Sequence, residues 1–279
     1  MRRLLTIAAG CLVTALLVFR ETLPLQTPGS RVDFLDIGQG DAALVTLDRD
    51  WQILIDGGPD PSVLRKIGRI MPRLDRRIEL VVLTHPHLDH YGGLVSVLER
   101  YEVPVLLVRQ DSQEPAYQRL LKEARKNGTA VVPAAGQRLV IRGGSLHVLD
   151  PLSAEQPHLS NANDASVVVK LELHGTTFLF PGDAEEGQER RLLRAGGLGA
   201  DFLKVGHHGS RTSSTAEFLE SVRPSVCVVS VGAGNRHGHP APEALDRLSE
   251  QGCRIARTDR HGTVSVLVAG RGVSVRTER

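Results

Sequence analysis

The sequence Leu80-Val81-Val82-Leu83-Thr84-His85-Pro86-His87-Leu88-Asp89-His90 carries the strongest structural signal in this chain. Its apolar residues 80–83 predict a buried strand. The hexapeptide 85–90 that follows holds three imidazoles and one carboxylate. Neutral imidazole and carboxylate are ligands of borderline divalent metals such as zinc, iron and manganese. The stretch therefore predicts a metal site at the end of a strand.

The spacing within this hexapeptide accommodates two metal ions. In an extended segment, successive side chains alternate faces, so His85, His87 and Asp89 begin on one side and His90 points to the other. The alternative is a solvated histidine-rich turn. A surface turn seldom needs three histidines and an acid followed at once by Gly92-Gly93, so we favour the metal site.

Length and composition indicate a globular protein. The chain has 279 residues, of which 41% are hydrophobic, which is enough for a buried core. The formal net charge is only +2, from 34 Lys plus Arg and 32 Asp plus Glu, so the total predicts no strong attraction to nucleic acid. A basic cluster precedes the metal motif and could either hold phosphates or form a solvated helix face. Its members are Arg65, Lys66, Arg69, Arg73, Arg76 and Arg77.

The N-terminus differs from the rest of the chain. Arg2 and Arg3 precede an apolar run, Leu4 to Phe19. Sixteen residues make about 24 Å of helix against a hydrocarbon core of about 30 Å, so a signal peptide and a short signal anchor both fit. We expect residues 1–30 to be this segment plus a linker and 31–279 to be the folded domain. The positive charge before the run predicts that this domain is exported or membrane-anchored outside the cytoplasm.

Two cysteines lie in the predicted domain, and neither has metal-ligand spacing. An exported domain could join Cys227 to Cys253, but the sequence favours two buried, unpaired thiols. Trp51 is expected to be a strand residue packed against the core.

The rest of the chain alternates between short strands and helices. Strands are predicted at 32–37, 42–47, 52–55, 80–84, 105–108, near 131, and at 139–141, 146–149, 166–173, 177–180, 202–205, 226–231, 254–256, 263–268 and 273–275. Helices are predicted at 61–70, 90–100, 115–126, 184–194, 215–222 and 242–251. Two sheets packed together, with helices on both outer faces, would bury such strands.

Other polar residues follow predicted strands, where loops on a rigid scaffold usually carry function. Asp56 follows 53–55, Asp183 follows 178–182, and the pair His207-His208 follows 203–206. His239 lies a short loop after Val231. A lone Asp after a strand is usually a helix cap. The repetition of such residues at strand ends favours a functional interpretation.

The hexapeptide matches the HxHxDH signature of the metallo-β-lactamase-fold hydrolases, which the chain resembles over about residues 31–276. Within that superfamily it looks most like the metallo-β-lactamase domain of the ComEC family of bacterial DNA-uptake channels. The segments that carry this resemblance are Phe34-Leu35-Asp36-Ile37-Gly38-Gln39-Gly40-Asp41-Ala42, Ile55-Asp56-Gly57-Gly58, His207-His208-Gly209-Ser210, Gly238-His239-Pro240 and Arg257-Thr258-Asp259. The multi-span channel has no counterpart here, so we expect the hydrolase domain alone behind one apolar segment.

The resemblance implies a four-layer αββα sandwich with two divalent metal ions, zinc or alternatively manganese, at one edge between the sheets. By motif, His85 and His87 would bind the first metal, and Asp89 and His90 the second. Asp183 would bridge the two metals, and His207 would complete the second site. Asp56 would support the ligand loops by hydrogen bonding.

Two departures from the superfamily pattern leave the ligand set open. Many members supply a further histidine to the first metal, but here the corresponding stretch reads Ser160-Asn161-Ala162-Asn163-Asp164-Ala165-Ser166, with His158 outside the motif. Asn163 or Asp164 could complete the first site, or that site could be ligand-poor. The last ligand is His207 or His239, and we favour His207. His208 and His239 are assigned to substrate binding or proton transfer.

These assignments predict a metal-dependent phosphodiesterase, specifically a DNase related to natural transformation. In this mechanism a metal-activated hydroxide positioned by Asp183 attacks the phosphodiester, and His208 or His239 protonates the leaving oxygen. Asp89, a metal ligand, is the fourth catalytic candidate. Its expected partners are DNA or another phosphodiester, and the membrane if the N-terminal segment is uncleaved. Hydrolysis of a lactone, β-lactam or thioester is an alternative, because a fold does not dictate its substrate. A non-catalytic module that binds nucleic acid or protein is the third possibility.

Overall fold

The structure is a computed structural model that describes residues 29–109, 112–153, 161–270 and 272–279. The predicted signal or anchor segment and His158 lie outside these residues. Within the described ranges, no helix is both long enough and apolar enough to cross a bilayer.

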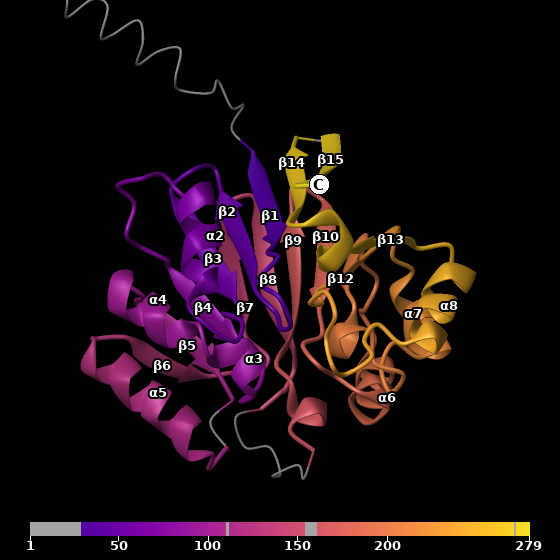
Figure 1. Ribbon diagram of the computed structural model, residues 1–279, viewed down its shortest axis with the longest axis horizontal. Coiled ribbons are helices and arrows are strands. Elements are labelled where there is room, and N and C mark those ends of the chain that lie inside the picture. Colours follow the sequence, from indigo (N-terminus) through magenta and orange to yellow (C-terminus); the bar gives the residue numbers. More distant parts are fainter. Residues whose placement is uncertain (1–28, 110–111, 154–160, 271) are drawn as a thin grey trace, which may run out of the picture.

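Two mixed sheets form the centre of the molecule (Figure 1). The first sheet runs in the order β15 (Gly272–Thr277), β14 (Val264–Ala269), β1 (Ser30–Phe34), β2 (Ala43–Leu47), β3 (Trp51–Ile55), β4 (Leu80–Leu83), β5 (Val105–Val108) and β6 (Ala130–Pro133). Strands β3 to β6 are parallel to one another, and the other neighbours pair antiparallel. The ends of β3 and β4 that lead into functional loops therefore lie at the same edge.

The second sheet has the same division into a parallel and an antiparallel part. Its order is β13 (Arg254–Arg257), β12 (Val226–Val229), β11 (Phe202–Lys204), β10 (Thr176–Phe180), β9 (Val168–Leu173), β8 (Gly144–Asp150) and β7 (Arg138–Ile141). Strands β10 to β13 are parallel. The loops after β10, β11 and β12 consequently leave the sheet at one edge as well.

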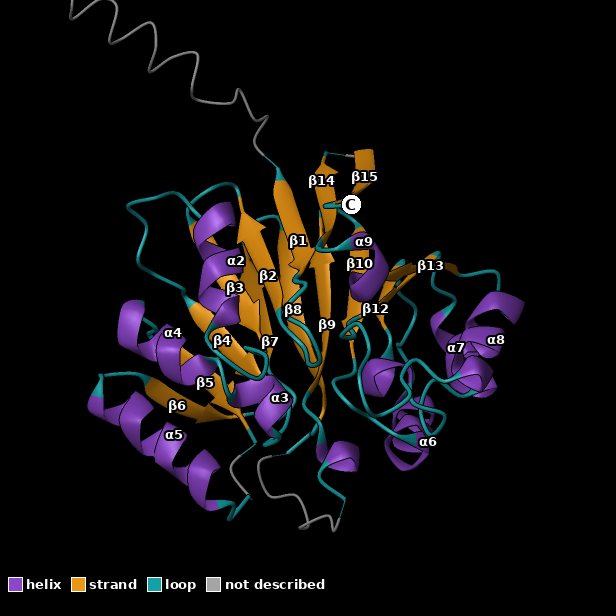
Figure 2. Ribbon diagram, in the orientation of Figure 1, coloured by secondary structure: helices purple, strands orange, loops and turns teal. Residues whose placement is uncertain are grey.

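Helices cover the outer face of each sheet, which completes a four-layer αββα sandwich (Figure 2). On the first sheet lie α2 (Ser62–Ile70), α4 (Leu94–Arg100) and α5 (Pro115–Lys126). On the second lie α6 (Glu186–Ala195), α7 (Ala216–Val222) and α8 (Pro242–Glu250). The predicted fold class is confirmed. It follows from strands that are apolar on both faces, because such strands need a covering layer on each side.

The apolar layer between the sheets fixes how the two halves meet. Phe34 of the first sheet stacks on Phe180 of the second, with ring centroids 5.6 Å apart. Val82 and Val169 belong to the same buried cluster, and Trp51 packs against it as expected from the sequence. Phe34 and Phe180 are the last residues of β1 and β10, so their contact holds the two sheets together beside the loops that follow the strands.

One predicted helix is divided in the structure. The sequence predicts a continuous helix over 90–100, but the chain forms α3 (Leu88–Tyr91), then Gly92-Gly93, then α4. A Cβ atom on Gly92 would collide with the carbonyl oxygen of Pro59, and one on Gly93 with that of Gly57. The two segments therefore lie close enough for backbone hydrogen bonds. The Gly93 N–H donates to the Gly58 carbonyl at 2.9 Å, and the Gly57 N–H donates to the His90 carbonyl at 2.7 Å. The break therefore joins the metal motif to the loop after β3.

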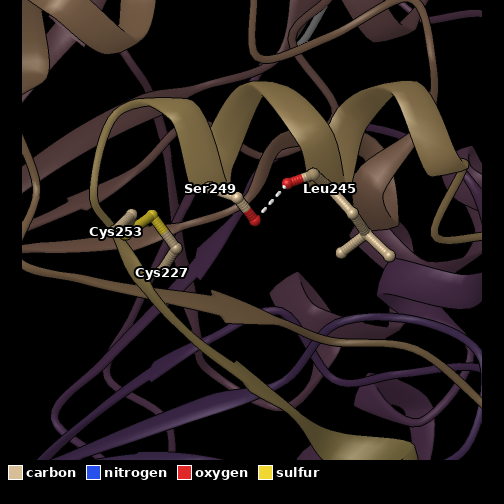
Figure 3. The surroundings of a disulfide bond; sticks show 4 residues. All are labelled: Cys227, Leu245, Ser249 and Cys253. Atoms are coloured by element: carbon tan, nitrogen blue, oxygen red, sulfur yellow. Dashed lines mark hydrogen bonds between the residues drawn. A yellow bond between two sulfur atoms is a disulfide. The ribbon is translucent and has the colours of Figure 1, made fainter.

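The predicted state of the cysteines was wrong. Cys227 on β12 and Cys253, the residue before β13, form a disulfide with Cα atoms 5.9 Å apart (Figure 3). The two strands are parallel neighbours, with Cys227 in register with Ile255. The pairing of these strands brings together two thiols that are 26 residues apart in the sequence, and residue spacing alone does not reveal it. The bond lies beside the end of α8 (Figure 3).

Candidate metal centre

Loops from both sheets meet to form one cluster of imidazoles and carboxylates. The first sheet supplies Asp56 after β3 and the hexapeptide 85–90 after β4. The second supplies Asp183 after β10 and the pair His207-His208 after β11. All of these loops lie at the carboxyl ends of parallel strands, the usual place for ligand-binding residues in such sheets.

Asp56 holds the metal motif in its conformation. Its Oδ1 accepts a hydrogen bond from the Thr84 backbone N–H at 2.8 Å, and its Oδ2 accepts one from the Thr84 hydroxyl at 2.8 Å. The same Oδ2 lies 2.8 Å from His90 Nδ1. These contacts turn His90 Nε2 toward the cluster. They are the interactions expected of a residue that supports the ligand loops rather than binding metal itself.

Asp183 lies at the centre of the cluster. Its Oδ2 is 3.4 Å from His90 Nε2 and 3.5 Å from His208 Nε2. The same oxygen is 3.8 Å from both His85 Nε2 and His207 Nε2. One buried carboxylate oxygen is thus surrounded by four imidazoles from both sheets, as a ligand shared between two metals would be.

His208 lies deeper in the cluster than the sequence suggested. Its Nε2 is 3.1 Å from Asp89 Oδ2, and its Nδ1 is 3.0 Å from the Ser230 carbonyl oxygen. Asp89, His90 and His208 offer ligand atoms that all lie within 4.8 Å of one another. The geometry therefore places His208 with Asp89 and His90, in the position predicted for His207.

His207 faces the cluster from another side. Its Nε2 points toward Asp183, and its Nδ1 lies 3.1 Å from Glu185 Oε1. Both histidines adopt left-handed backbone conformations, with φ of 46° for His207 and 53° for His208. Such conformations cost a non-glycine residue roughly 1–2 kcal/mol, and they concentrate at functional sites. This strained turn directs two adjacent rings toward one carboxylate.

The remaining members of the hexapeptide lie beside Asp183. His85 is fully buried, and its Nε2 is 3.1 Å from His87 Nδ1. His85, His90 and Asp183 form a second group whose ligand atoms lie within 4.8 Å of one another. His87 is only partly buried and closes the outer side of this group.

The loop expected to complete the first site makes other contacts. Asp164 accepts a hydrogen bond from the Gln188 backbone N–H at 3.1 Å, so it serves the first turn of α6. Asn163 Nδ2 donates to Glu185 Oε1 at 3.1 Å. Asn163 therefore reaches the cluster through Glu185, which also contacts His207. Within the described residues, Asp164 belongs to no group of clustered ligand atoms.

The sequence analysis assigned no role to two buried charged residues, Asp41 and Lys204. The Lys204 ammonium forms an ion pair with Asp41, lies 3.5 Å from Asp183 Oδ1 and donates to the Gly182 carbonyl at 3.0 Å. Asp41 Oδ1 is also 3.3 Å from His208 Nδ1. The available signal was a single lysine inside the apolar strand segment 202–205 and an acid in the turn before β2.

Burial and neighbouring charges set the protonation of the cluster. Burial lowers the pKa of His85 well below its usual value. Burial would also lower the pKa of His90, but the Asp183 and Asp56 carboxylates outweigh it and raise that pKa well above its usual value. The pKa of His208 rises to about 9 despite burial, because Asp183 and Asp41 face it. Without a metal, protons on His90 and His208 thus balance the buried carboxylates.

The pKa of His239 is shifted in the opposite direction from those of His90 and His208. Partial burial, together with the charges on His207 and His208, lowers the pKa of His239 to about 4. Its ring centroid lies 5.5 Å from that of His207 and 6.3 Å from that of His208. His239 is therefore a neutral imidazole on the rim of the cluster at neutral pH.

The donor set fits divalent metal ions. The Nε2 atom of His90 is buried and makes no well-aligned hydrogen bond within the described residues, although Asp183 Oδ2 is near. A buried polar atom in this state needs an explanation. A divalent cation held by these imidazoles and carboxylates would replace the protons on His90 and His208 and satisfy that atom.

Three arginines of the basic cluster lie away from these ligands. Arg73, Arg76 and Arg77 precede β4, whereas the ligand loop follows it, so the arginines are at the other end of the strand. Arg77 pairs with Glu102, and Arg76 lies over the Tyr101 ring at 5.8 Å. For these three arginines, the exposed position before β4 agrees with a solvated surface rather than with a phosphate site beside the ligands.

The sequence matches the Metallo-beta-lactamase superfamily over residues 35–232, and the chain belongs to that superfamily. It is related to competence proteins of the ComEC type. ComE operon protein 3 of Bacillus subtilis is 31% identical over 261 residues, and Recombination protein 2 of Haemophilus influenzae is 30% identical over 258 residues. Competence protein ComA of Neisseria gonorrhoeae is 30% identical over 251 residues. These matches cover 86%, 90% and 88% of this chain but only 33%, 30% and 33% of the relatives, so the chain spans about a third of their length.

Solved structures share the fold. CmlA, a diiron β-hydroxylase from Streptomyces venezuelae, aligns with a TM-score of 0.56 at 15% identity over 86% of this chain and 54% of that one. A diphosphatase from the PhnP family aligns with a TM-score of 0.50 at 16% identity over 86% of this chain and 98% of that one. At these identities the likeness concerns the fold alone.

Proposed function

We propose that this protein is a metal-dependent phosphodiesterase that acts on DNA. The observation that carries the proposal is the buried oxygen of Asp183, which four imidazoles from two sheets surround at 3.4 to 3.8 Å. The relationship to competence proteins supports DNA as the substrate. Hydrolysis is the chemistry that such a set of oxygen and nitrogen ligands serves.

The ligands divide into two sets that would hold two divalent ions, zinc or manganese. Asp89, His90 and His208 form one set, and His85 and His87 form the other. Asp183 is shared between them. His207, oriented by Glu185, takes the place left by the histidine missing near Asn163. Metal ions bound there would supply Lewis acidity and an activated water for hydrolysis.

The protein's own groups orient the reaction. Asp56 fixes the His90 ring through Nδ1 and so leaves Nε2 free for the cluster. The Ser230 carbonyl fixes the His208 ring in the same way. His208 thereby serves as a ligand rather than as a proton donor. His239, a neutral imidazole on the rim, is the group we assign to donate an N–H hydrogen bond to the leaving oxygen.

An activity assay tests this function. We expect the purified protein with zinc or manganese to hydrolyse single-stranded or double-stranded DNA and bis(p-nitrophenyl) phosphate. The double variant Asp89→Ala/His90→Ala should lose at least about a hundredfold in rate, because it removes two ligands of one set. A chromogenic β-lactam serves as the competing substrate. Faster turnover of the β-lactam than of DNA, or equal rates for the variant and the wild type, would contradict the proposal.

We also propose that the domain works outside the cytoplasm, exported or anchored by the apolar segment 4–19, where it meets DNA. The Cys227–Cys253 disulfide supports this location, since structural disulfides form in oxidising compartments. A maleimide-based gel shift on denatured protein from intact cells tests it. We expect Cys11 alone to react before reduction, or no cysteine if the segment has been removed. The Cys227→Ser/Cys253→Ser variant is the control, and reaction of Cys227 and Cys253 without reduction would contradict an oxidising location.

A further inference from the structure

A pocket of about 450 Å³ opens directly beside the metal ligand Asp89. Its walls come from four segments: the turn before β2, the segment after β3, the start of α3 after β4, and the loop that leads from β12 toward α8. The lining residues are Gln39, Pro59, Leu88, Asp89, Asn235, Arg236 and His237. A group held in this pocket would lie beside Asp89.

The loop after β12 is held in place by one side chain. Asn235 Oδ1 accepts hydrogen bonds from the backbone N–H groups of His237 and His239, both at 3.1 Å. Its Nδ2 donates to the carbonyl oxygens of Gly232 at 3.0 Å and His239 at 2.7 Å. The loop is therefore ordered before a ligand arrives, which reduces the entropy cost of binding.

Arg236 supplies a positive charge to the rim of this pocket. The side chain is exposed, and its guanidinium makes no hydrogen bond or ion pair with a described residue. Arginine in this state matches the geometry of a phosphate group. A phosphate next to the one being cleaved would find the guanidinium available.

The pocket also offers flat and apolar surface. Leu88 is 62% exposed although it lies between two metal-ligand positions, His87 and Asp89. The His237 ring stacks on that of His239 with centroids 5.8 Å apart, so it extends the rim as a platform. Surfaces that combine a cation with flat or apolar side chains suit the sugar and base of a nucleotide.

We propose that this pocket is a subsite for the nucleotide that flanks the scissile phosphodiester, with Arg236 binding the flanking phosphate. The proposal rests on the proposed function and specifies its substrate as a polynucleotide rather than an isolated diester. Leu88 and His237 contact the sugar and base of the flanking nucleotide. Arg236 determines specificity in this scheme and takes no part in the chemical step.

The test compares Arg236→Gln with a matched control, Arg254→Gln. Arg254 is exposed at the start of β13, the end of the strand opposite the metal loops. We expect Arg236→Gln to raise KM for a short single-stranded oligodeoxynucleotide by about tenfold, with kcat much less affected. The salt dependence of log kcat/KM should lose about 0.7 from its slope, the share of one phosphate contact on a single strand. Arg254→Gln should leave both quantities within about twofold, and Arg236→Lys should restore part of the affinity.

A second substrate separates this proposal from the proposed function. Bis(p-nitrophenyl) phosphate has no flanking nucleotide, so the Arg236→Gln loss should be several times larger on the oligodeoxynucleotide. Equal losses on both substrates, or no loss on the oligodeoxynucleotide, would overturn the subsite. If the wild type cleaves neither substrate, the proposed function fails. The subsite is then judged by fluorescence anisotropy of the labelled oligodeoxynucleotide, where unchanged affinity in Arg236→Gln overturns it.

Discussion

The Lys204 ammonium balances the negative charge of two buried carboxylates in the candidate metal centre. Its side chain is only 4% exposed, and its ammonium contacts Asp41 and Asp183. Burial would lower the pKa of Lys204, but these two carboxylates outweigh it and raise that pKa. The charge of Lys204 therefore stabilises the folded protein. This contribution is complete at a pH below about 10.4, the pKa of lysine in the unfolded chain, and it is lost as the pH rises through the pKa of Lys204 in the folded protein.

Replacing Lys204 tests this balance. We expect Lys204→Met to lower the free energy of unfolding of the metal-free protein by about 3–5 kcal/mol, because it leaves buried carboxylates without their partner. Urea denaturation measures the change. Lys170→Met is the control: Lys170, on β9 of the same sheet, donates to the Gly197 carbonyl at 2.9 Å, and its loss should cost about 1 kcal/mol or less. The double variant Lys204→Met/Asp41→Asn should lose less than the two single losses combined. A Lys204→Met protein as stable as Lys170→Met would refute the assignment.

Residue-level prediction from the sequence succeeded where a residue type has few other uses. Three imidazoles after a buried strand indicate metal binding without any knowledge of the fold. Prediction from the sequence was less effective for Glu185 and Asp41, because a single acidic residue in a loop has many ordinary roles. Their part in the site depends on which loops the two sheets bring together, and local sequence does not encode that pairing.

At the level of elements, strands were the more predictable part. Apolar runs such as 80–83 and 226–229 are short and bounded by polar residues, so their positions follow from burial on both faces. The helix at 90–100 was predicted as continuous because its apolar spacing continues across Gly92-Gly93. The break arises because Gly92 and Gly93 contact the loop after β3. Such a tertiary contact cannot be predicted from the spacing of apolar residues.

The turn at 206–209 is a second place where the sequence did not specify the local structure, and it lies in the candidate metal centre. The sequence favoured His207 over His239 as the last ligand because one helix separates its strand from Asp183. In the structure, the left-handed conformations of His207 and His208 direct both rings inward. The choice between adjacent histidines depends on backbone dihedral angles, which residue types at these positions do not specify.

Across the whole molecule, the metal centre and the start of the domain lie at opposite edges. Strand β1 is antiparallel to β2, which is antiparallel to β3, so β1 runs parallel to the strands whose far ends carry Asp56 and His85. The chain therefore enters β1 at Ser30, at the edge away from the ligand loops. A domain attached through its N-terminal end would hold the ligand loops at its free edge.

The ligands come from both sheets, so metal binding should stabilise the whole domain. Asp89 and His90 belong to the first sheet, and Asp183 and His208 to the second, and the four groups approach one another only in the native state. A metal at 100 times its dissociation constant stabilises the native state by about 2.7 kcal/mol. For a domain of this size we expect removal of metal with a chelator to lower Tm by about 5–10 °C. Differential scanning calorimetry with added zinc or manganese measures the shift. Asp183→Asn, which weakens the shared ligand, should show a much smaller one, and an equal shift in both proteins would show that the metal binds elsewhere.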